Sequence, residues 1–148
     1  MFNSVLMVCT GNICRSPMAE YLLKDRWQHS GAVVASAGTA ALVNHPADDE
    51  ALAVMQDHGI DMQAHRARQL QAQLVADHEL ILTMEPHHAR WLMSRFPTAR
   101  GRVYALTHWV GEHDHVPDPY CQGRRAFERT WDILVPAIDS WVERLAGS

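Results

Sequence analysis

Hydrophobic residues along the chain gather in short continuous runs, which alternate with longer stretches where apolar residues recur at helical spacing. A short apolar run bounded by turn residues is typical of a strand that is buried on both faces. We therefore predict four strands, at residues 6–9, 33–37, 79–83 and 102–105.

The stretches with helical spacing predict four helices. The first begins near Pro17, the second runs from about Pro46 to Gly59, the third follows Pro86, and the last carries an apolar stripe from Phe127 to Leu145. Pro136 lies inside this last stripe. It predicts either a kink or a later start of the helix, because proline removes one helical hydrogen bond.

The alternation of strands and helices predicts an α/β fold, because helices that connect parallel strands cover both faces of the sheet. We expect a single three-layer domain over residues 1–148, with a central four-stranded parallel sheet and helices on both faces. A chain of 148 residues, of which 47% are hydrophobic, is long enough to bury a substantial core. Ligands of such folds bind beyond the carboxyl ends of the strands, where Cys9 would lie.

Composition argues against several classes of protein. The sequence has no run of 18 or more apolar residues, so we expect no transmembrane segment, and no signal peptide is evident. Three cysteines favour a reducing, cytoplasmic location over a disulfide framework. A formal net charge of −4 argues against general binding of nucleic acid.

The most informative segment is residues 8–17, Val-Cys-Thr-Gly-Asn-Ile-Cys-Arg-Ser-Pro, which joins the first predicted strand to the first predicted helix. At such a junction, backbone N–H groups and the positive end of the helix dipole face one small concavity. The concavity suits a tetrahedral dianion, and the Arg15 guanidinium matches two phosphate oxygens. Cys9 would lie at its floor, where these groups and the Ser16 hydroxyl favour the thiolate.

Other residues of the segment also suit an anion-binding loop. Gly11 permits backbone angles that other residues resist, Asn12 tolerates left-handed geometry, and Pro17 suits the first helical position. Taken singly, these residues have ordinary explanations. The pattern Cys-x5-Arg occurs by chance in many chains, Ser16 could only cap a helix, and Cys9 could only be a buried thiol. Their order along the chain favours the anion-binding interpretation.

A phosphate ester that loses its phosphoryl group needs a proton on the leaving oxygen, and a nearby carboxylic acid would supply it. The best candidate is Asp118, in Val-Pro-Asp-Pro-Tyr at residues 116–120. The flanking prolines stiffen the loop and keep Asp118 out of helical geometry, and a bound phosphate dianion would favour its protonated form. On its own, Asp-Pro is also an ordinary turn signal.

The loop from Cys9 to Pro17 resembles the signature loop of the low-molecular-weight protein tyrosine phosphatases, which lies at the N-terminus of chains of about this length. The resemblance continues at residues 36–39, 65–70, 80–84 and 117–120. The first and last motifs are specific in combination, and the middle ones are supportive. The run at 38–43 and the pair His108-Trp109 look most like the bacterial branch associated with capsule and exopolysaccharide export.

The resemblance implies an enzyme that hydrolyses phosphotyrosine in proteins through a phosphocysteine intermediate, with no metal and no cofactor. Cys9 would be the nucleophile, Arg15 would bind phosphate, and Asp118 would be the general acid and base. The other substrate-binding residues would be Thr10, Gly11, Asn12, Ile13, Cys14 and Ser16 in the loop, with Tyr120, Leu42 and His45 in the pocket walls. Ser36 would support the loop through a hydrogen bond with Asn12. The implied partner is a tyrosine autokinase of polysaccharide export.

Several interpretations stay open. Cys14 is either a resolving thiol that forms a reversible disulfide with Cys9 or a small buried residue at the helix start, and Cys121 has no assigned role. The ten histidines raise a metal hypothesis, at 108–115 and at the pair His87-His88. We expect no metal site, because neighbouring loop side chains often point apart.

Two other functions are compatible with a loop of this kind. Arsenate reductases share the fold and the loop, but they need further cysteines in the middle of the chain, and there are none between Cys14 and Cys121. A phosphate-binding module without activity is disfavoured because Cys9, Arg15 and Asp118 are present together. Phosphatase activity is therefore the leading hypothesis.

Overall fold

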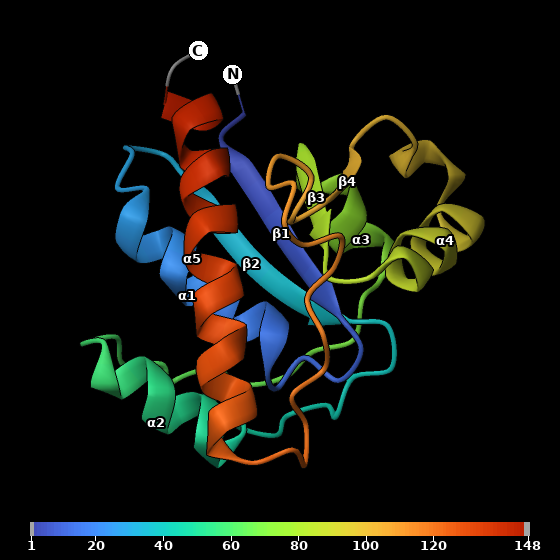
Figure 1. Cartoon of the computed structure of the whole chain (residues 1–148). Coiled ribbons are helices and arrows are strands. Elements are labelled where there is room, and N and C mark those ends of the chain that lie inside the picture. The colour runs from blue at the N-terminus through green and yellow to red at the C-terminus, as the bar shows by residue number, and fades with distance from the viewer. Residues whose placement is uncertain (1, 147–148) are drawn as a thin grey trace.

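The central strand of the molecule is β1 (Ser4–Cys9), in which all six residues are buried (Figure 1). The structure, a computed structural model, describes residues 2–146. Side chains alternate across a strand, and successive residues of β1 belong to two separate hydrophobic clusters, one on each face of the sheet. Burial on both faces explains why the sequence shows a continuous apolar run here.

Three more strands complete a parallel sheet in the order β2-β1-β3-β4. They are β2 (Val33–Gly38), β3 (Leu80–Thr83) and β4 (Val103–Ala105). The register pairs Cys9 with Gly38, and Val8 with Thr83. The carboxyl ends of β1, β2 and β3 therefore meet at one edge of the sheet.

Helices cover both faces of the sheet, which confirms the predicted α/β arrangement. On one face lie α1 (Arg15–Arg26) and α5 (Arg124–Ala146), with α2 (Asp49–Asp57) packed against α5. The other face packs against α3 (Ala72–Ala76), α4 (Pro86–Arg95) and the 3₁₀ turn Pro97–Ala99. No helix within residues 2–146 is long and apolar enough to span a membrane.

The predicted strands are confirmed to within two residues, but several helix bounds differ. The first helix begins at Arg15 rather than near Pro17. The second begins at Asp49 because the Asp48 side chain accepts the backbone N–H of Glu50, which caps the helix. The sequence analysis did not predict α3 or the 3₁₀ turn, which are too short to show helical periodicity.

The expectation of a later start for the last helix is wrong, because α5 begins at Arg124 and contains Pro136. Figure 1 shows it as one continuous helix beside α1. Pro136 is exposed and follows a half-buried Val135. The apolar stripe of α5 supplies Phe127, Leu134 and Ile138 to the core, and this packing outweighs the hydrogen bond lost at proline.

The two ends of the described chain lie together, away from the carboxyl ends of the strands. Phe2 and Leu145 line one cavity, together with Tyr104, Trp109, Trp141 and Arg144. From there β1 runs through the sheet to Cys9 (Figure 1). The chain ends and the predicted anion-binding loop are therefore at opposite ends of the molecule.

Candidate active site

The turn between β1 and α1 contains the predicted anion-binding loop, and its left-handed residue is Asn12. Asn12 has a φ of 59° and is fully buried. Gly11 lies outside the left-handed region, so the expectation that Gly11 takes an unusual angle is wrong. Asparagine tolerates the left-handed conformation better than most residues because its side chain forms local hydrogen bonds.

A buried hydrogen-bond network holds Asn12 in this conformation. Its amide nitrogen Nδ2 donates to Ser16 Oγ at 2.8 Å and to Ser36 Oγ at 2.9 Å. Its Oδ1 accepts from the backbone N–H of Arg68 at 2.9 Å. Ser36 in turn donates to Glu20 Oε1 at 2.6 Å. The bond between Asn12 and Ser36, which the resemblance implied, is present, and both side chains lie behind the loop.

His65 also supports the loop through a hydrogen bond, because its Nε2 lies 2.7 Å from the carbonyl oxygen of Asn12. This carbonyl can only accept, so Nε2 carries the proton. Burial lowers the pKa of His65, although the bond to Asn12 opposes this effect. His65 was noted in the sequence only as part of a supporting motif, and its contact with the loop was not predicted.

Cys9 is buried at the carboxyl end of β1, with its Sγ 2.8 Å from Ser16 Oγ. Since Ser16 Oγ already accepts a hydrogen bond from Asn12 Nδ2, its own hydroxyl proton is available to Cys9 Sγ. Ser16 lies inside α1, whose N-cap is Cys14, so the alternative that Ser16 only caps the helix is wrong. The loop therefore presents a hydroxyl donor to the sulfur.

Cys14 differs from Cys9 in its surroundings. Burial, and then the charge of Asp48, raise the pKa of the Cys14 thiol far above its usual range. The thiolate is the form that attacks a disulfide or a sulfenic acid. Burial therefore favours the neutral thiol of Cys14 in this arrangement.

Arg15 is 2% exposed, and a half-buried carboxylate and a buried carbonyl satisfy one end of its guanidinium group. Nη1 donates to Glu85 Oε2 at 2.7 Å and to the Val116 carbonyl at 2.8 Å. Nη2 lies 3.9 Å from Asp118 Oδ2. A buried cation without such partners would carry a large desolvation cost. Glu85 offsets this cost while the other end of the guanidinium faces the cavity described below.

Glu85 is one of the residues at this site that were not predicted from the sequence. Partial burial alone would raise the pKa of Glu85, but the hydrogen bond and charge of Arg15 outweigh it and lower the pKa below its usual value. Glu85 follows β3 by two residues, at the same sheet edge as Cys9. That position was the available signal, since functional side chains collect at the carboxyl ends of parallel strands.

A cavity of about 210 Å³ lies at the carboxyl edge of the sheet. It is lined by Cys9, Thr10, Gly11, Ile13, Cys14, Arg15, Ala40, Leu42, Asp118 and Tyr120. The structure thus brings together the thiol, the guanidinium and the carboxyl group that the sequence singled out. Ala40 was not predicted. Asn12, Ser16 and Ser36 do not line the cavity, because their side chains support the loop from behind.

His45 does not line the cavity, so the structure does not place it in the pocket wall as expected. Its side chain is exposed. Its backbone N–H donates to the Leu42 carbonyl at 3.0 Å, and its carbonyl accepts from Ala67 at 2.8 Å. This turn leaves Leu42 at the cavity.

Asp118 and Tyr120 line the cavity from the loop that precedes α5. The Asp118 side chain is 53% exposed, and its Oδ1 accepts the backbone N–H of Tyr120 at 3.1 Å. This local turn needs no regular secondary structure, as expected for a carboxyl group between two prolines. Tyr120 is 47% exposed and lines the same cavity.

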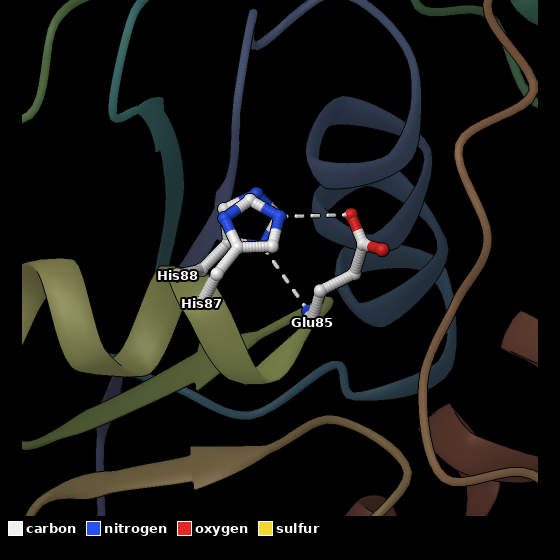
Figure 2. A group of neighbouring side chains, drawn as sticks. All are labelled: Glu85, His87 and His88. Carbon is white, nitrogen blue, oxygen red and sulfur yellow. Dashed lines mark hydrogen bonds and ion pairs between the residues drawn. The ribbon is translucent and has the colours of Figure 1, made fainter.

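Among the residues that the structure describes, the possible metal ligands that come together are at 85–88 and not at 108–115. Glu85, His87 and His88 have possible ligand atoms within 4.8 Å of one another (Figure 2). However, both ring nitrogens of His88 are hydrogen-bonded, and Glu85 Oε2 is shared by Arg15 and His87. A metal ion would have to break these bonds, so the group does not fit a preformed metal site.

Comparison with known proteins identifies the family. Residues 4–148 match the family described as low molecular weight phosphotyrosine protein phosphatase. The chain belongs to this family. Its relative Wzb of Salmonella typhimurium, a low molecular weight protein-tyrosine-phosphatase, is 44% identical over 145 residues, covering 98% of this chain and 95% of Wzb.

Solved structures of the low molecular weight phosphatase fold agree with this assignment. The tyrosine phosphatase AmsI of Erwinia amylovora has a TM-score of 0.92 and 40% identity, over 97% of this chain and 93% of AmsI. The YwlE arginine phosphatase of Geobacillus stearothermophilus has a TM-score of 0.91 and 33% identity, over 97% of this chain and 93% of YwlE. The resemblance to the bacterial branch seen in the sequence is confirmed.

Proposed function

We propose that this chain hydrolyses phosphotyrosine in proteins, with Cys9 as nucleophile, Arg15 as phosphate ligand and Asp118 as general acid and base. The observation that carries the proposal is the convergence of these three side chains on one cavity, with a hydroxyl donor 2.8 Å from the sulfur. Membership of the phosphatase family supports it. The proposal treats residues 1–148 as one phosphatase domain.

In the first step, the Cys9 thiolate attacks the phosphorus atom and forms a P–S bond while the bond between phosphorus and the tyrosyl oxygen breaks. Asp118 gives its proton to the leaving tyrosyl oxygen. Arg15 and the loop amides stabilise the charge on the equatorial oxygens. The Ser16 hydroxyl stabilises the sulfur as an anion before attack.

In the second step, water attacks the phosphorus atom and the P–S bond breaks. Asp118, now ionised, takes a proton from this water, and inorganic phosphate and the Cys9 thiolate are released. The exposed position of Asp118 suits this role, because its carboxyl group contacts both solvent and the cavity. No step requires a metal ion, so treatment with EDTA should leave the rate unchanged.

The cavity walls favour an aromatic ester. Ile13 and Leu42 supply apolar surface, and Tyr120 presents an open ring on which a phenyl group can stack. A guanidinium leaving group, as in phosphoarginine, would find one carboxyl group here, that of Asp118. Phosphotyrosine is therefore the substrate to expect, and phosphoarginine is the competitor to test because of the similarity to YwlE.

Two variants test the mechanism. Cys9→Ser should abolish turnover of p-nitrophenyl phosphate, and a substantial residual rate would remove Cys9 from its role. Asp118→Asn should slow hydrolysis of a phosphotyrosine peptide by about 100-fold or more, because a general acid contributes about 10²–10⁴ in rate. The loss should be smaller for p-nitrophenyl phosphate, whose leaving group needs no proton. Equal losses on both substrates would contradict the role of Asp118.

We also infer a cytoplasmic location and a physiological partner, a tyrosine autokinase of polysaccharide export. The support is the similarity to Wzb and AmsI, together with three free cysteines among the described residues. Incubating the enzyme with the phosphorylated autokinase of the same organism tests the partner. Phosphotyrosine on the kinase should disappear with wild-type enzyme and persist with Cys9→Ser.

A further inference from the structure

His88 is a fully buried histidine next to the phosphate loop, and the proposed chemistry does not use it. It lies in the first turn of α4, next to His87 and Glu85 (Figure 2). Its Nδ1 lies 3.1 Å from the backbone nitrogen of Glu85, and its Nε2 lies 2.9 Å from Thr10 Oγ1. The ring thus connects two segments that are 75 or more residues apart in sequence.

The direction of each hydrogen bond follows from the partners. A backbone N–H can only donate, so Nδ1 of His88 accepts from Glu85. In a neutral imidazole the proton is then on Nε2, which donates to Thr10 Oγ1. Burial, and then the charges of Arg15 and His87, lower the pKa of His88 to about 4, whereas Glu85 opposes the shift. The ring is therefore neutral at neutral pH.

The His88 ring and its two hydrogen bonds form a bridge between Glu85 and Thr10. Each end of this bridge contacts one half of the site. At one end, Glu85 binds the Arg15 guanidinium through its side chain while its backbone binds His88. At the other end, Thr10 directly follows Cys9 and lines the cavity. The Thr10 carbonyl is fixed separately, by the N–H of Ala40 at 3.0 Å. The imidazole is thus the contact that ties the Thr10 side chain to the segment holding Arg15.

We propose that His88 is a positioning residue of this phosphatase site, which fixes the phosphate loop at Thr10 relative to the Glu85–Arg15 pair. The inference rests on the proposed function. It assigns His88 no contact with substrate. Its effect is on the geometry of the loop, where a displacement of about 1 Å can cost up to about 100-fold in rate.

Two substitutions at position 88 distinguish the effect of the hydrogen-bonded bridge from the effect of side-chain packing. A glutamine amide nitrogen occupies the place of Nε2, so His88→Gln keeps a donor for Thr10. An asparagine oxygen occupies the place of Nδ1, so His88→Asn keeps the acceptor for Glu85 but loses Thr10. We expect His88→Asn to lower kcat/KM for p-nitrophenyl phosphate by about 10-fold. His88→Gln should stay within about threefold of wild type.

A substitution of Thr10, at the other end of the bridge, should cause the same loss of kcat/KM. Thr10→Val removes the hydroxyl at nearly constant shape and should also lower kcat/KM by about 10-fold. The double variant His88→Asn/Thr10→Val should be no slower than the worse single variant by more than about twofold, because both changes break one interaction. Multiplied losses in the double variant would overturn the proposal.

Phosphate affinity is the second readout, measured by calorimetry with inorganic phosphate. The dissociation constant should rise in His88→Asn and in Thr10→Val and should return towards the wild-type value in His88→Gln. This measurement needs no turnover. If wild-type enzyme hydrolyses no phosphate ester, the proposed function fails, but the affinities still test the bridge.

His78→Asn is the matched control, because His78 is another buried histidine and precedes the amino end of β3, away from the cavity. It should lower the melting temperature without changing kcat/KM or phosphate affinity. A merely structural His88 would behave in the same way, with stability reduced and both functional readouts within twofold of wild type. That result, or equal behaviour of His88→Gln and His88→Asn, would refute the positioning role.

Discussion

At the scale of single residues, Gly38, the last residue of β2, leaves no room for a side chain. A Cβ atom built on Gly38 would lie 2.3 Å from the Thr10 carbonyl oxygen and 3.1 Å from Ala41 Cβ. Both neighbours are held by the backbone, so neither can move without shifting the loop. Glycine is therefore required here by close approach and not by an unusual φ.

Gly38→Ala should accordingly displace Thr10 and the loop that contains Cys9. We expect destabilisation of about 1–3 kcal/mol, as for other overpacked sites, and a fall in kcat/KM of at least about 10-fold. Urea unfolding and steady-state kinetics measure the two effects. Gly111→Ala is the control, since nothing lies within 4 Å of its Cβ position. Wild-type kinetics in Gly38→Ala would mean that the loop tolerates the displacement.

Tyr120 permits a prediction about binding alone. Its ring lines the cavity, but its hydroxyl group has no part in the proposed chemistry. Tyr120→Phe should keep the KM for a phosphotyrosine peptide, whereas Tyr120→Ala should raise KM by about fivefold, which corresponds to about 1 kcal/mol of lost ring stacking. An equal increase in KM for both variants would assign the contribution to the hydroxyl group instead.

At the scale of secondary structure elements, Pro136 is an unfavourable residue inside α5. Its ring prevents one helical hydrogen bond, yet the side chain is exposed and contributes little to the core. Pro136→Ala should therefore raise the free energy of unfolding, by about 1 kcal/mol after relaxation of the helix. Urea denaturation measures this, and the urea dependence (m-value) should be unchanged. A less stable variant would show that α5 is adapted to the proline.

The elements also show what the sequence could predict. The strands, most of the helices and the loop at residues 8–17 were found because their signals are local: apolar runs, helical spacing, and a motif at a strand end. The supporting residues Arg68, Glu85 and His88 were missed as contacts of this loop, because they come from distant segments. Only the packing of the parallel sheet brings them to Asn12, Arg15 and Thr10.

At the scale of the whole molecule, neutral buried histidines couple folding to pH. His88 has a pKa of about 4 in the folded chain, against 6.5 for an ordinary histidine. As pH falls below 6.5, the unfolded chain binds a proton that the folded chain does not, so stability decreases until the pH reaches about 4. The full loss is about 3 kcal/mol. Burial lowers the pKa of His65 in the same direction.

Urea unfolding at about pH 7 and about pH 4.5 tests this coupling. Wild-type protein should lose more stability between the two conditions than His88→Gln, which has no titrating group at this position. His65 and Glu85 remain in both proteins, so their contributions cancel in the comparison. An identical loss in the two proteins would mean that His88 is protonated in the folded chain.

The shared cavity of Phe2 and Leu145 has a practical consequence for handling this enzyme. An affinity tag, a fluorescent protein or a surface tether attached at either terminus would project from the end of the domain opposite the catalytic cleft. A protein substrate would still have access to the cavity. Because the ends are close together, a short peptide could also join them, and a circular permutant opened at an exposed turn should retain its catalytic geometry.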